Sequence, residues 1–380
     1  MVELNELCEV YSGYAFKKFN NSSNGIPVIK IGNILSDGNV DLDNCVFTEE
    51  KPKDKFYSRK GDIYIALSGA TTGKVAIMNS DNVFAINQRV GIVRNQSCVP
   101  NDYLKYFLIS KSNQILKEAA GCAQPNISPK QISRYDIPIL SEMSMRSISD
   151  KLNKIKKVIT SYETELDLLD DLTKARFVEM FGLPVSNSKQ YPIKKMKEIA
   201  PVVQYNGEYS QQVWLLNLDM VESQTGRVLD YNMIDLDDVG NSTCKFDTSN
   251  VLYSKLRPYL NKVVIPDKKG YATSELVPLQ PKKDVINREY LAYLLRSDEF
   301  VGMINEKVAG AKMPRVSMSE FREFNVPIPP LSLQNQFADF VRETDKSRLV
   351  YYPLSQNYPI FSFIADILHL MYLYIRFLLF

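Results

Sequence analysis

Histidine is almost absent from this 380-residue sequence, whose single copy is His369 near the C-terminus. The main body of the chain therefore has no imidazole for a catalytic triad, a histidine metal site or general base chemistry. This absence removes most hydrolase mechanisms and directs attention to binding functions.

Cysteine is also scarce, with five copies at positions 8, 45, 98, 122 and 244 that form no close pairs. That spacing argues against a zinc site and indicates a reducing compartment. No N-terminal signal peptide is visible, because the first apolar residues alternate with polar ones. We therefore expect a cytoplasmic protein.

The sequence also lacks a strong charge imbalance, since 46 Lys and Arg face 44 Asp and Glu for a net charge of +2. Any nucleic-acid surface must therefore come from local clustering of basic residues. The hydrophobic fraction of 45% is ordinary for a globular protein, and the length allows two domains with separate cores.

A nucleotide-binding loop is missing as well. The segment GATTGK at 69–74 is one residue short of the phosphate-binding loop pattern, and Val75 follows it where Ser or Thr is required. A hairpin turn is the favoured interpretation, with an ATP site as the alternative. No pattern of catalytic residues stands out elsewhere.

What the sequence does contain is a repeat. GCAQPNISPKQISRYDIPI at 121–139 is echoed by GAKMPRVSMSEFREFNVPI at 310–328, an offset of 189 residues by subtraction of 121 from 310. In each copy a glycine follows an amphipathic segment and can end a helix, and Pro125 or Pro314 prevents the helix from resuming. A run with a proline closes each copy and predicts an edge strand.

Within both copies, Ser128 with Gln131 and Ser317 with Glu320 match the capping box that opens a helix. Upstream, residues 61–77 align with 249–265, and both stretches predict strand, polar turn and strand. Segments 27–42 and 213–230 share an apolar strand, a turn with glycine and a second strand. The scaffold repeats and the turns differ, which indicates two sites of one kind with different specificities.

A long helix is predicted between the repeats, from residue 148 to 181, where Gly182 and Pro184 stop it. Apolar residues recur along it at spacings of four and three, as in a coiled-coil seam: Ile148, Leu152, Ile155, Ile159, Tyr162, Leu166 and Leu169. Leu168, Leu172 and Val178 broaden this stripe. A dimerisation helix and a spacer between two domains both fit the pattern, and the duplication favours the spacer.

These features together resemble the specificity subunit of a type I restriction-modification system. The resemblance covers residues 1 to about 348 and is carried by NISPKQISRYDIPIL, RVSMSEFREFNVPIPPLSLQNQF, the helix ending KARFVEMFG, and their order along the chain. It implies a non-catalytic DNA reader with two target recognition domains and two antiparallel spacer helices. It also implies modification subunits that methylate adenine with S-adenosylmethionine and a restriction subunit that uses ATP; this chain itself is expected to bind no cofactor.

The resemblance implies an α+β fold in which two similar recognition domains are joined by a long coiled-coil helix and the second spacer helix is truncated or altered. The expected divisions are a first recognition domain at 1–145, the central helix at 146–182, a second recognition domain at 183–330, the start of the distal helix at 331–348 and an atypical tail at 349–380. Double-stranded DNA is the expected ligand, and self-association through the exposed seam is a further possibility.

Candidate DNA-binding residues follow from side-chain chemistry, since Arg and Lys suit guanine, Asn and Gln suit adenine, and Lys, Ser and Thr suit phosphates. The first repeat offers Ser68, Thr71, Thr72, Lys74, Asn87, Gln88, Arg89, Gln124 and Asn126. The second offers Lys255, Arg257, Tyr259, Lys262, Lys312 and Arg315. For each of these candidates, the alternative interpretation is a solvated surface residue with no role in binding.

The C-terminal tail departs from the family pattern, because it is aromatic and apolar and has no heptads from about residue 349. A membrane helix over 360–380 has the length but carries Asp366, His369 and Arg376. A frame-shifted end is the favoured alternative. For the whole chain, a coiled-coil scaffold or membrane-tethered adaptor remains the competing function.

Overall fold

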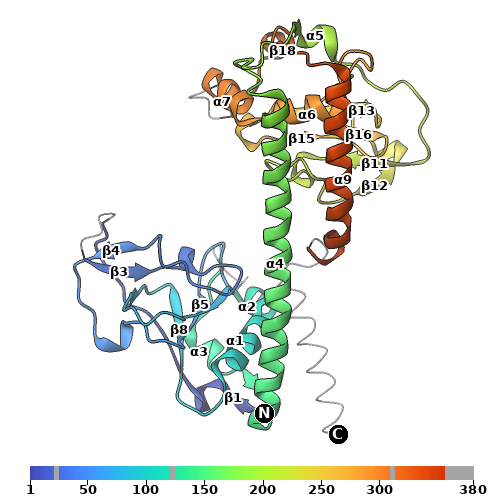
Figure 1. The fold of residues 1–380 in the computed structure, drawn as a ribbon. Coiled ribbons are helices and arrows are strands. Elements are labelled where there is room, and N and C mark those ends of the chain that lie inside the picture. The colour runs from blue at the N-terminus through green and yellow to red at the C-terminus, as the bar shows by residue number, and fades with distance from the viewer. Residues whose placement is uncertain (21–24, 120–124, 309–312, 356–380) are drawn as a thin grey trace. The chain divides into compact units, whose positions relative to one another are not determined.

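The computed structural model describes residues 1–20, 25–119, 125–308 and 313–355, with side chains up to residue 347 (Figure 1). The chain divides into a first unit, Met1–Ser161, and a second unit, Tyr162–Pro353. Each unit is a mixture of helices and small sheets, which confirms the α+β class. Within the described residues, no helix has both the length and the apolar character needed to cross a membrane.

The first unit contains three small sheets and three short helices. Its strands pair in the orders β2-β8-β5-β6, β4-β3-β7 and β1-β9. The elements are β1 Val2–Glu3, β2 Cys8–Ser12, β3 Ile26–Ile29, β4 Val46–Thr48, β5 Ile63–Ala66, β6 Val75–Ile77, β7 Ala85–Ile86, β8 Val90–Asn95, α1 Asn101–Ser110, α2 Ser112–Ala119, α3 Pro129–Ile132 and β9 Asp136–Ile137.

The second unit has a similar arrangement, but its sheet around β14 has three strands where the first unit's sheet around β5 has four, and its sheet around β11 has four where the sheet around β3 has three. Its sheets are β15-β14-β17, β12-β11-β16-β13 and β10-β18. The elements are β10 Ile193–Lys195, α5 Met196–Ile199, β11 Gln212–Leu216, β12 Asn232–Asp235, β13 Thr243–Phe246, β14 Val251–Ser254, β15 Val263–Val264, β16 Gly270–Thr273, β17 Leu276–Leu279, α6 Arg288–Arg296, α7 Asp298–Lys307, α8 Met318–Arg322 and β18 Asn325–Pro327.

The central strand of each unit is apolar throughout because both of its faces are buried. Along β5, Ile63 and Ile65 pack with the helices, while Tyr64 and Ala66 pack with residues of β3 and β7. This alternation follows from the period of two along a strand. In the second unit, β14 divides in the same way between the helix-side core and the core around Trp214.

The edge-strand prediction is confirmed in both repeats, because within the described part of the chain β9 pairs only with β1 and β18 only with β10. Equivalent tyrosines hold these strands: the Tyr103 hydroxyl donates to Pro138 O at 2.8 Å, and the Tyr290 hydroxyl donates to Pro327 O at 2.9 Å. The predicted capping box at Ser128 is confirmed. Ser317 caps its helix by accepting from the backbone N–H of Glu320 at 3.5 Å, but the described hydrogen bonds include none from Ser317 N back to the Glu320 side chain, so the second predicted capping box is only half formed.

The central helix α4, Glu142–Phe181, ends where the sequence predicted but begins six residues earlier than position 148. The Ser141 hydroxyl accepts from the Ser144 N–H at 3.2 Å and caps the helix, a signal that the apolar periodicity does not contain. The seam residues are buried or half-buried. Leu168, Leu172 and Val178 are instead exposed, so the predicted broadening of the buried stripe is wrong.

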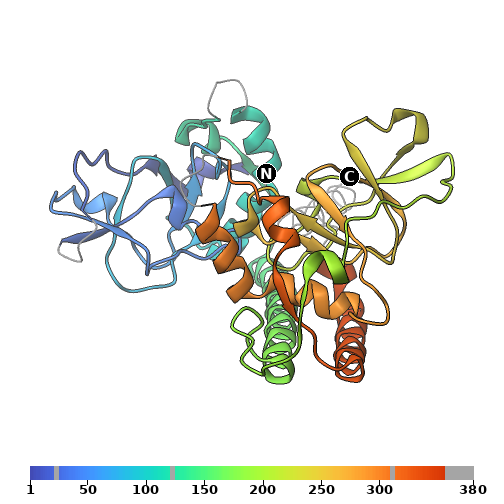
Figure 2. The same cartoon turned by 90° about the horizontal axis from the view of Figure 1, so that it is seen from above.

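The distal helix α9, Leu331–Ser355, runs alongside the second half of α4 within the second unit (Figures 1 and 2). Phe177 of α4 meets Phe337 at 5.4 Å between ring centroids, and Arg176 lies over the Phe340 ring at 6.0 Å, so the helices are antiparallel. The helix extends past its predicted end at 348, because backbone hydrogen bonds do not require an apolar stripe. The membrane-helix alternative concerns residues 360–380, which lie outside the described range, and of the tail in the frame-shift alternative the structure describes only 349–355.

Candidate nucleic-acid interface

The turn between β5 and β6 is held by three backbone hydrogen bonds to distant segments of the first unit. Leu67 N donates to Arg89 O at 2.9 Å, and Ile127 N donates to Leu67 O at 2.9 Å. Gly69 N donates to Pro125 O at 3.2 Å. The turn, the segment around Arg89 and the end of the repeated loop therefore lie side by side.

The turn between β14 and β15 makes the same three bonds in the second unit. Lys255 N donates to Glu275 O at 3.0 Å, and Val316 N donates to Lys255 O at 2.8 Å. Arg257 N donates to Pro314 O at 2.8 Å. The sequence alignment of 61–77 with 249–265 thus corresponds to matching backbone geometry, which establishes residue-by-residue equivalence of the two turns.

Both turns also contain left-handed residues at equivalent positions. Gly69 and Gly73 have φ near +84°, while Arg257 and Asn261 have φ of +51° and +50°. Glycine adopts this conformation without a Cβ clash, whereas an arginine there is strained and an asparagine tolerates it better. Asn261 is held by donating to Gln224 Oε1 at 3.2 Å and to Arg296 O at 2.9 Å. GATTGK is therefore a hairpin turn, as predicted.

The predicted residues of the first unit separate by exposure. Gln88, Arg89 and Asn126 are exposed, and Ser68, Thr71 and Lys74 are half-buried. Ser68 Oγ and Thr71 Oγ1 are buried atoms that lack a hydrogen-bond partner within the described ranges. These six side chains are the ones placed at or near the surface of the turn region.

Thr72 and Asn87, by contrast, are buried and stabilise the turns from within. The Thr72 hydroxyl donates to Gly69 O at 2.7 Å, and Asn87 Oδ1 accepts from Arg89 N at 3.2 Å. Their polar atoms are thus used in holding the backbone. Gln124 in the first unit and Lys312 in the second lie outside the described residues.

In the second unit Arg257, Tyr259 and Arg315 are exposed, whereas Lys255 and Lys262 are half-buried. Lys262 Nζ donates to Leu218 O at 2.6 Å, so this ammonium holds the segment after β11. Burial lowers the pKa of Lys262, and the charge of Asp219 opposes that shift. Lys262 is accordingly placed as a bridge between loops.

One polar residue at the second turn was missed by the sequence reasoning. Glu275 Oε1 accepts from Arg315 Nη2 at 2.8 Å, and its second oxygen is buried without a partner among the described residues. Glu275 occupies the place of Arg89, because each backbone carbonyl accepts from the equivalent residue of the turn. Beyond β6 the offset between the repeats falls from 188 (255 − 67) to 186 (275 − 89). An alignment that allowed for this change would have identified Glu275.

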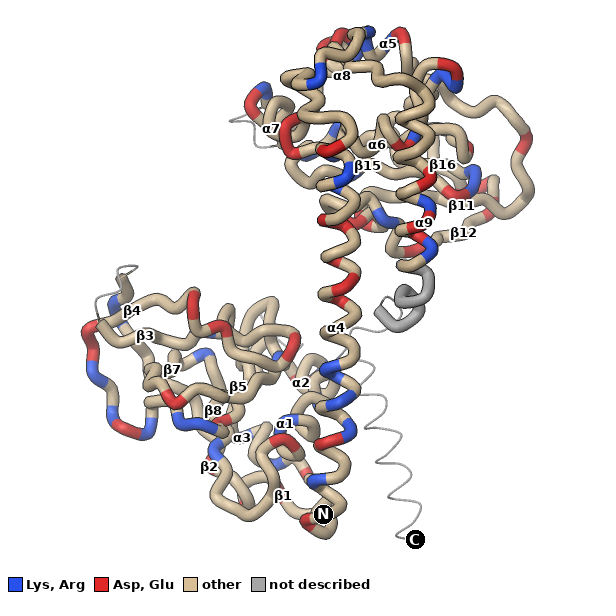
Figure 3. The backbone as a smooth tube through the Cα atoms, in the orientation of Figure 1, with Lys and Arg blue, Asp and Glu red and all other residues tan. Residues whose placement is uncertain are grey.

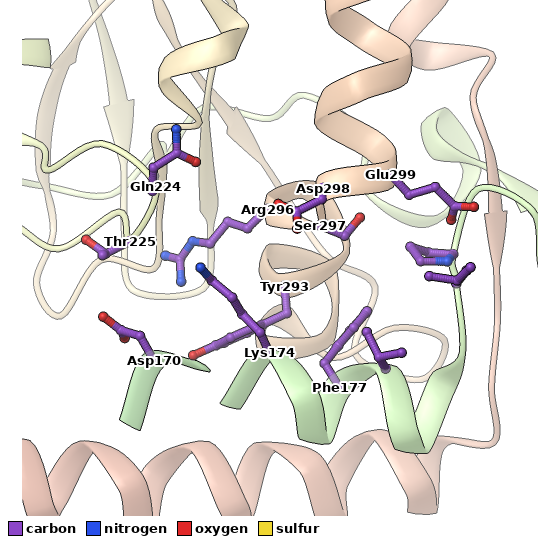
Figure 4. Close-up of a pocket in the computed structure, with 13 residues that line it drawn as sticks. Asp170, Lys174, Phe177, Gln224, Thr225, Tyr293, Arg296, Ser297, Asp298 and Glu299 are labelled. Carbon is purple, nitrogen blue, oxygen red and sulfur yellow. The ribbon is translucent and has the colours of Figure 1, made fainter. Parts of the chain in front are cut away.

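A cavity of about 130 Å³ lies elsewhere in the second unit, between α4, α6 and α7 (Figure 4). Two of its polar residues make structural contacts: Glu299 accepts from Val185 N at 2.6 Å, and Arg296 donates to Val263 O at 3.0 Å. Lys174 points into this space from α4. Across the described residues, no three His, Cys, Asp or Glu side chains are grouped as metal ligands.

Comparison with known proteins places this geometry in a family. The model of the type I restriction modification DNA specificity domain matches residues 1–169 and 219–349, more than half of the chain. The EcoDI specificity subunit of Escherichia coli is 21% identical over 312 residues, covering 72% of this chain and 69% of that protein. The MjaVIII specificity subunit of Methanocaldococcus jannaschii is 24% identical over 184 residues, 46% and 43% of the two chains.

A solved structure has a similar fold. The crystal structure of a type I restriction-modification S subunit from M. genitalium aligns with a TM-score of 0.56 at 15% identity, covering 97% of this chain and 94% of that one. At this identity the similarity supports the fold alone.

Proposed function

The chain belongs to the type I restriction modification DNA specificity family, and from that premise we propose that its two units each read one half of a two-part DNA target. Members of this family are non-catalytic subunits that recognise DNA. The coarse function is therefore DNA recognition, and the proposal concerns how this chain divides the task.

The duplicated turn is the observation that supports a two-part target. Two hairpin turns share their backbone hydrogen bonds and their left-handed positions, yet they present different side chains. Phosphate contacts position a protein on DNA, whereas side chains at base edges specify the sequence. A fixed frame with exchanged side chains is what two readers of different half-sites require.

The surface of α4 supports the proposed partners. Its first half is basic, with Lys151, Lys154, Lys156 and Lys157, and its second half is acidic, with Glu163, Glu165, Asp167 and Asp171 (Figure 3). Leu168 and Leu172 are 61% and 51% exposed beside the acidic residues. Exposed apolar residues among charges are typical of protein interfaces. We assign this face to the modification subunits, which would methylate adenine with S-adenosylmethionine, while a restriction subunit would use ATP.

Adenine methylation mapping tests the two-part target. The chain is co-expressed with its modification subunit, and methylated adenines are mapped across the host genome. The expected result is a motif of two short parts with a fixed gap. A stable complex that leaves no motif would overturn the proposal in favour of a scaffold or adaptor.

A matched pair of arginine variants sharpens this test in the first unit. Arg89→Gln is expected to alter only one half of the motif, because Arg89 is exposed beside the β5–β6 turn. Arg59→Gln removes the same charge from another exposed position of that unit and should leave the motif unchanged. An equal effect of both variants would show that only the overall charge matters.

A further inference from the structure

Asn126 and Arg315 occupy one shared position in the two units. Asn126 forms an isolated antiparallel bridge with Ser68, and Arg315 forms the equivalent bridge with Leu256. In each unit the residue before the shared position is a proline and the residue after it is apolar, and the backbones of both neighbours are hydrogen-bonded to the turn. Both side chains are exposed. The frame thus presents two different side chains from the same point.

The neighbour of this position changes sign between the units. In the second unit Glu275 holds Arg315 in an ion pair whose side chains are 19% and 59% exposed, respectively. In the first unit the place of Glu275 is taken by Arg89, a cation. Among the described residues, neither the Arg89 nor the Asn126 side chain has a hydrogen-bond or ion-pair partner. The acidic residue Glu275 is therefore present beside Arg315, and the equivalent place beside the amide side chain of Asn126 has no acidic residue.

The hydrogen-bonding capacity of each side chain fits one base. A guanidinium has five N–H donors, so Arg315 keeps enough donors for a bidentate contact after Glu275 accepts one. Two parallel N–H donors match O6 and N7 of guanine in the major groove, and the amide of asparagine matches N6 and N7 of adenine. Glu275 also offsets the positive charge that would otherwise draw Arg315 toward any phosphate.

We propose that this shared position reads one base in each half of the target: guanine through Arg315, oriented by Glu275, and adenine through Asn126. The inference rests on the proposed two-part DNA recognition and assigns the base class to named residues. Arg315 and Asn126 are specificity-determining residues, and Glu275 is a positioning residue that acts through Arg315.

Selection from a pool of randomised duplexes, with the chain assembled with its modification subunit, tests the assignment. The wild type is expected to select a guanine at one position of one half-site and an adenine at one position of the other. Arg315→Gln should change that guanine preference toward adenine, with a loss of discrimination of roughly 5- to 150-fold. Exchanging the two residues, by Arg315→Asn with Asn126→Arg, should exchange the two preferences.

The role of Glu275 is separated from a merely structural one by base preference. Glu275→Gln should reduce discrimination at the guanine position while total DNA affinity is unchanged or higher, because a negative charge is removed. Glu275→Asp keeps the charge and should restore part of the discrimination. The Glu275–Arg315 pair is partly exposed and contributes little to stability, so these variants are expected to fold.

Arg322→Gln is the matched control, because Arg322 is an exposed arginine on α8 of the same unit. This variant should bind slightly less tightly and keep the base preferences. A two-part motif whose preferences do not respond to changes at Arg315, Asn126 or Glu275 would overturn the assignment and leave the proposed function intact. If no motif is selected at all, the proposed function itself fails.

Discussion

The two units place different polar pairs at the same point of their cores. In the first unit, Arg94 Nη2 lies 2.7 Å from Asp62 Oδ2, and their side chains are 6% and 2% exposed. In the second unit, Asn250 Nδ2 donates to Gln280 Oε1 at 3.0 Å. The strand registers make the two pairs equivalent. Asp62 and Arg94 stand next to the paired residues at the start of β5, and Asn250 and Gln280 stand next to the paired residues at the start of β14. The first unit thus has a buried ion pair where the second has a neutral amide pair, of which Asn250 is buried and Gln280 half-buried.

The comparison shows which part of this site the fold requires. Asp62 accepts from Arg59 N at 2.8 Å, and Asn250 accepts from Asp247 N at 2.9 Å, so both units need an acceptor there. Only the first unit adds a charge. The hydrogen bond between Arg94 and Asp62 raises the pKa of Arg94 above its ordinary value, so the guanidinium stays charged. Replacing a whole buried ion pair is often neutral, whereas removing one partner leaves a buried charge.

The largest expected effect comes from breaking the charged pair. Arg94→Gln leaves the Asp62 carboxylate buried without its cation, and we expect the first unit to lose about 3 to 5 kcal/mol of unfolding free energy. Urea denaturation measures this with two probes. The only tryptophan, Trp214, is buried in the second unit and reports on that unit, while circular dichroism reports on both. The tryptophan transition should move far less than the dichroism transition.

Copying the neutral pair into the first unit is the matched control. The double variant Asp62→Asn with Arg94→Gln should recover most of the lost stability, because no buried charge remains. Gln280→Ala in the second unit should lose only about 1 to 3 kcal/mol and should move the tryptophan transition. If the double variant is as unstable as Arg94→Gln alone, the two pairs are not interchangeable and the equivalence drawn from the registers is wrong.

The turns give a second and smaller difference between the units. Gly69 has φ of +84°, and among the described residues the only atom that a Cβ there would meet within 4 Å is Ile31 Cδ1, at 3.5 Å. Gly69→Ala should therefore lose about 1 to 2 kcal/mol through backbone strain alone. Arg257→Gly relieves the same strain but makes the unfolded chain more flexible, so a gain below about 1 kcal/mol is expected.

DNA binding distinguishes the two turn variants further. Arg257→Gly removes an exposed cation and should weaken DNA binding even though stability is kept, whereas Gly69→Ala removes no cation. Strain retained at a non-glycine residue is typical of functional sites. Salt-dependent binding to the selected duplex measures this. If the Arg257→Gly variant binds DNA as tightly as the wild type, the strained arginine has no role in binding.

The repeat itself was predictable because short-range sequence patterns specify it. The alignment of 61–77 with 249–265 and the cap at Ser128 depend on residues close together in the chain. Asp62, Arg94 and Glu275 were not predicted as members of pairs. Their partners come from strands joined by loops of different length, so no local pattern carries the pairing.

The limits of the helices illustrate the same distinction. The end of α4 was predicted because Gly182, with φ of +72°, is a local stop signal. The start was missed, since Ser141 caps the helix before its apolar seam begins. Likewise, exposure of Leu168 and Leu172 depends on which neighbours pack on α4, and periodicity alone does not name those neighbours.

The two ends of α4 are attached to their units by different chemistry. In the first unit, Asn153 Nδ2 donates to Asp102 Oδ2 at 3.0 Å, and the Tyr106 hydroxyl donates to Asn153 Oδ1 at 2.7 Å. In the second unit, Phe177 and Phe181 pack on Tyr290, with ring centroids 5.6 and 4.7 Å apart. The second attachment adds an ion pair between Asp170 of α4 and Arg227, whose Oδ2 and Nη2 lie 3.1 Å apart. The pKa of Asp102 is lowered, so the first attachment should respond to acid.

The smallest expected effect is a pH dependence at the Asp102 attachment. Burial raises the pKa of Asp102, but hydrogen bonds from Lys105 and Asn153 outweigh it and leave the pKa below its ordinary value. Because the pKa of Asp102 is lower in the folded than in the unfolded state, its charge stabilises the folded protein fully above the unfolded pKa of about 3.9. This stabilisation is lost as the pH falls through the pKa of the folded state. Asp102→Asn should therefore be less stable than the wild type at pH 6 by under about 1 kcal/mol, because the side chain is partly exposed and screened by water. Urea denaturation of both proteins between pH 6 and pH 3 should show this difference shrinking below about pH 4. A difference that stays constant across that range would mean that the Asp102 charge does not stabilise the junction between α1 and α4.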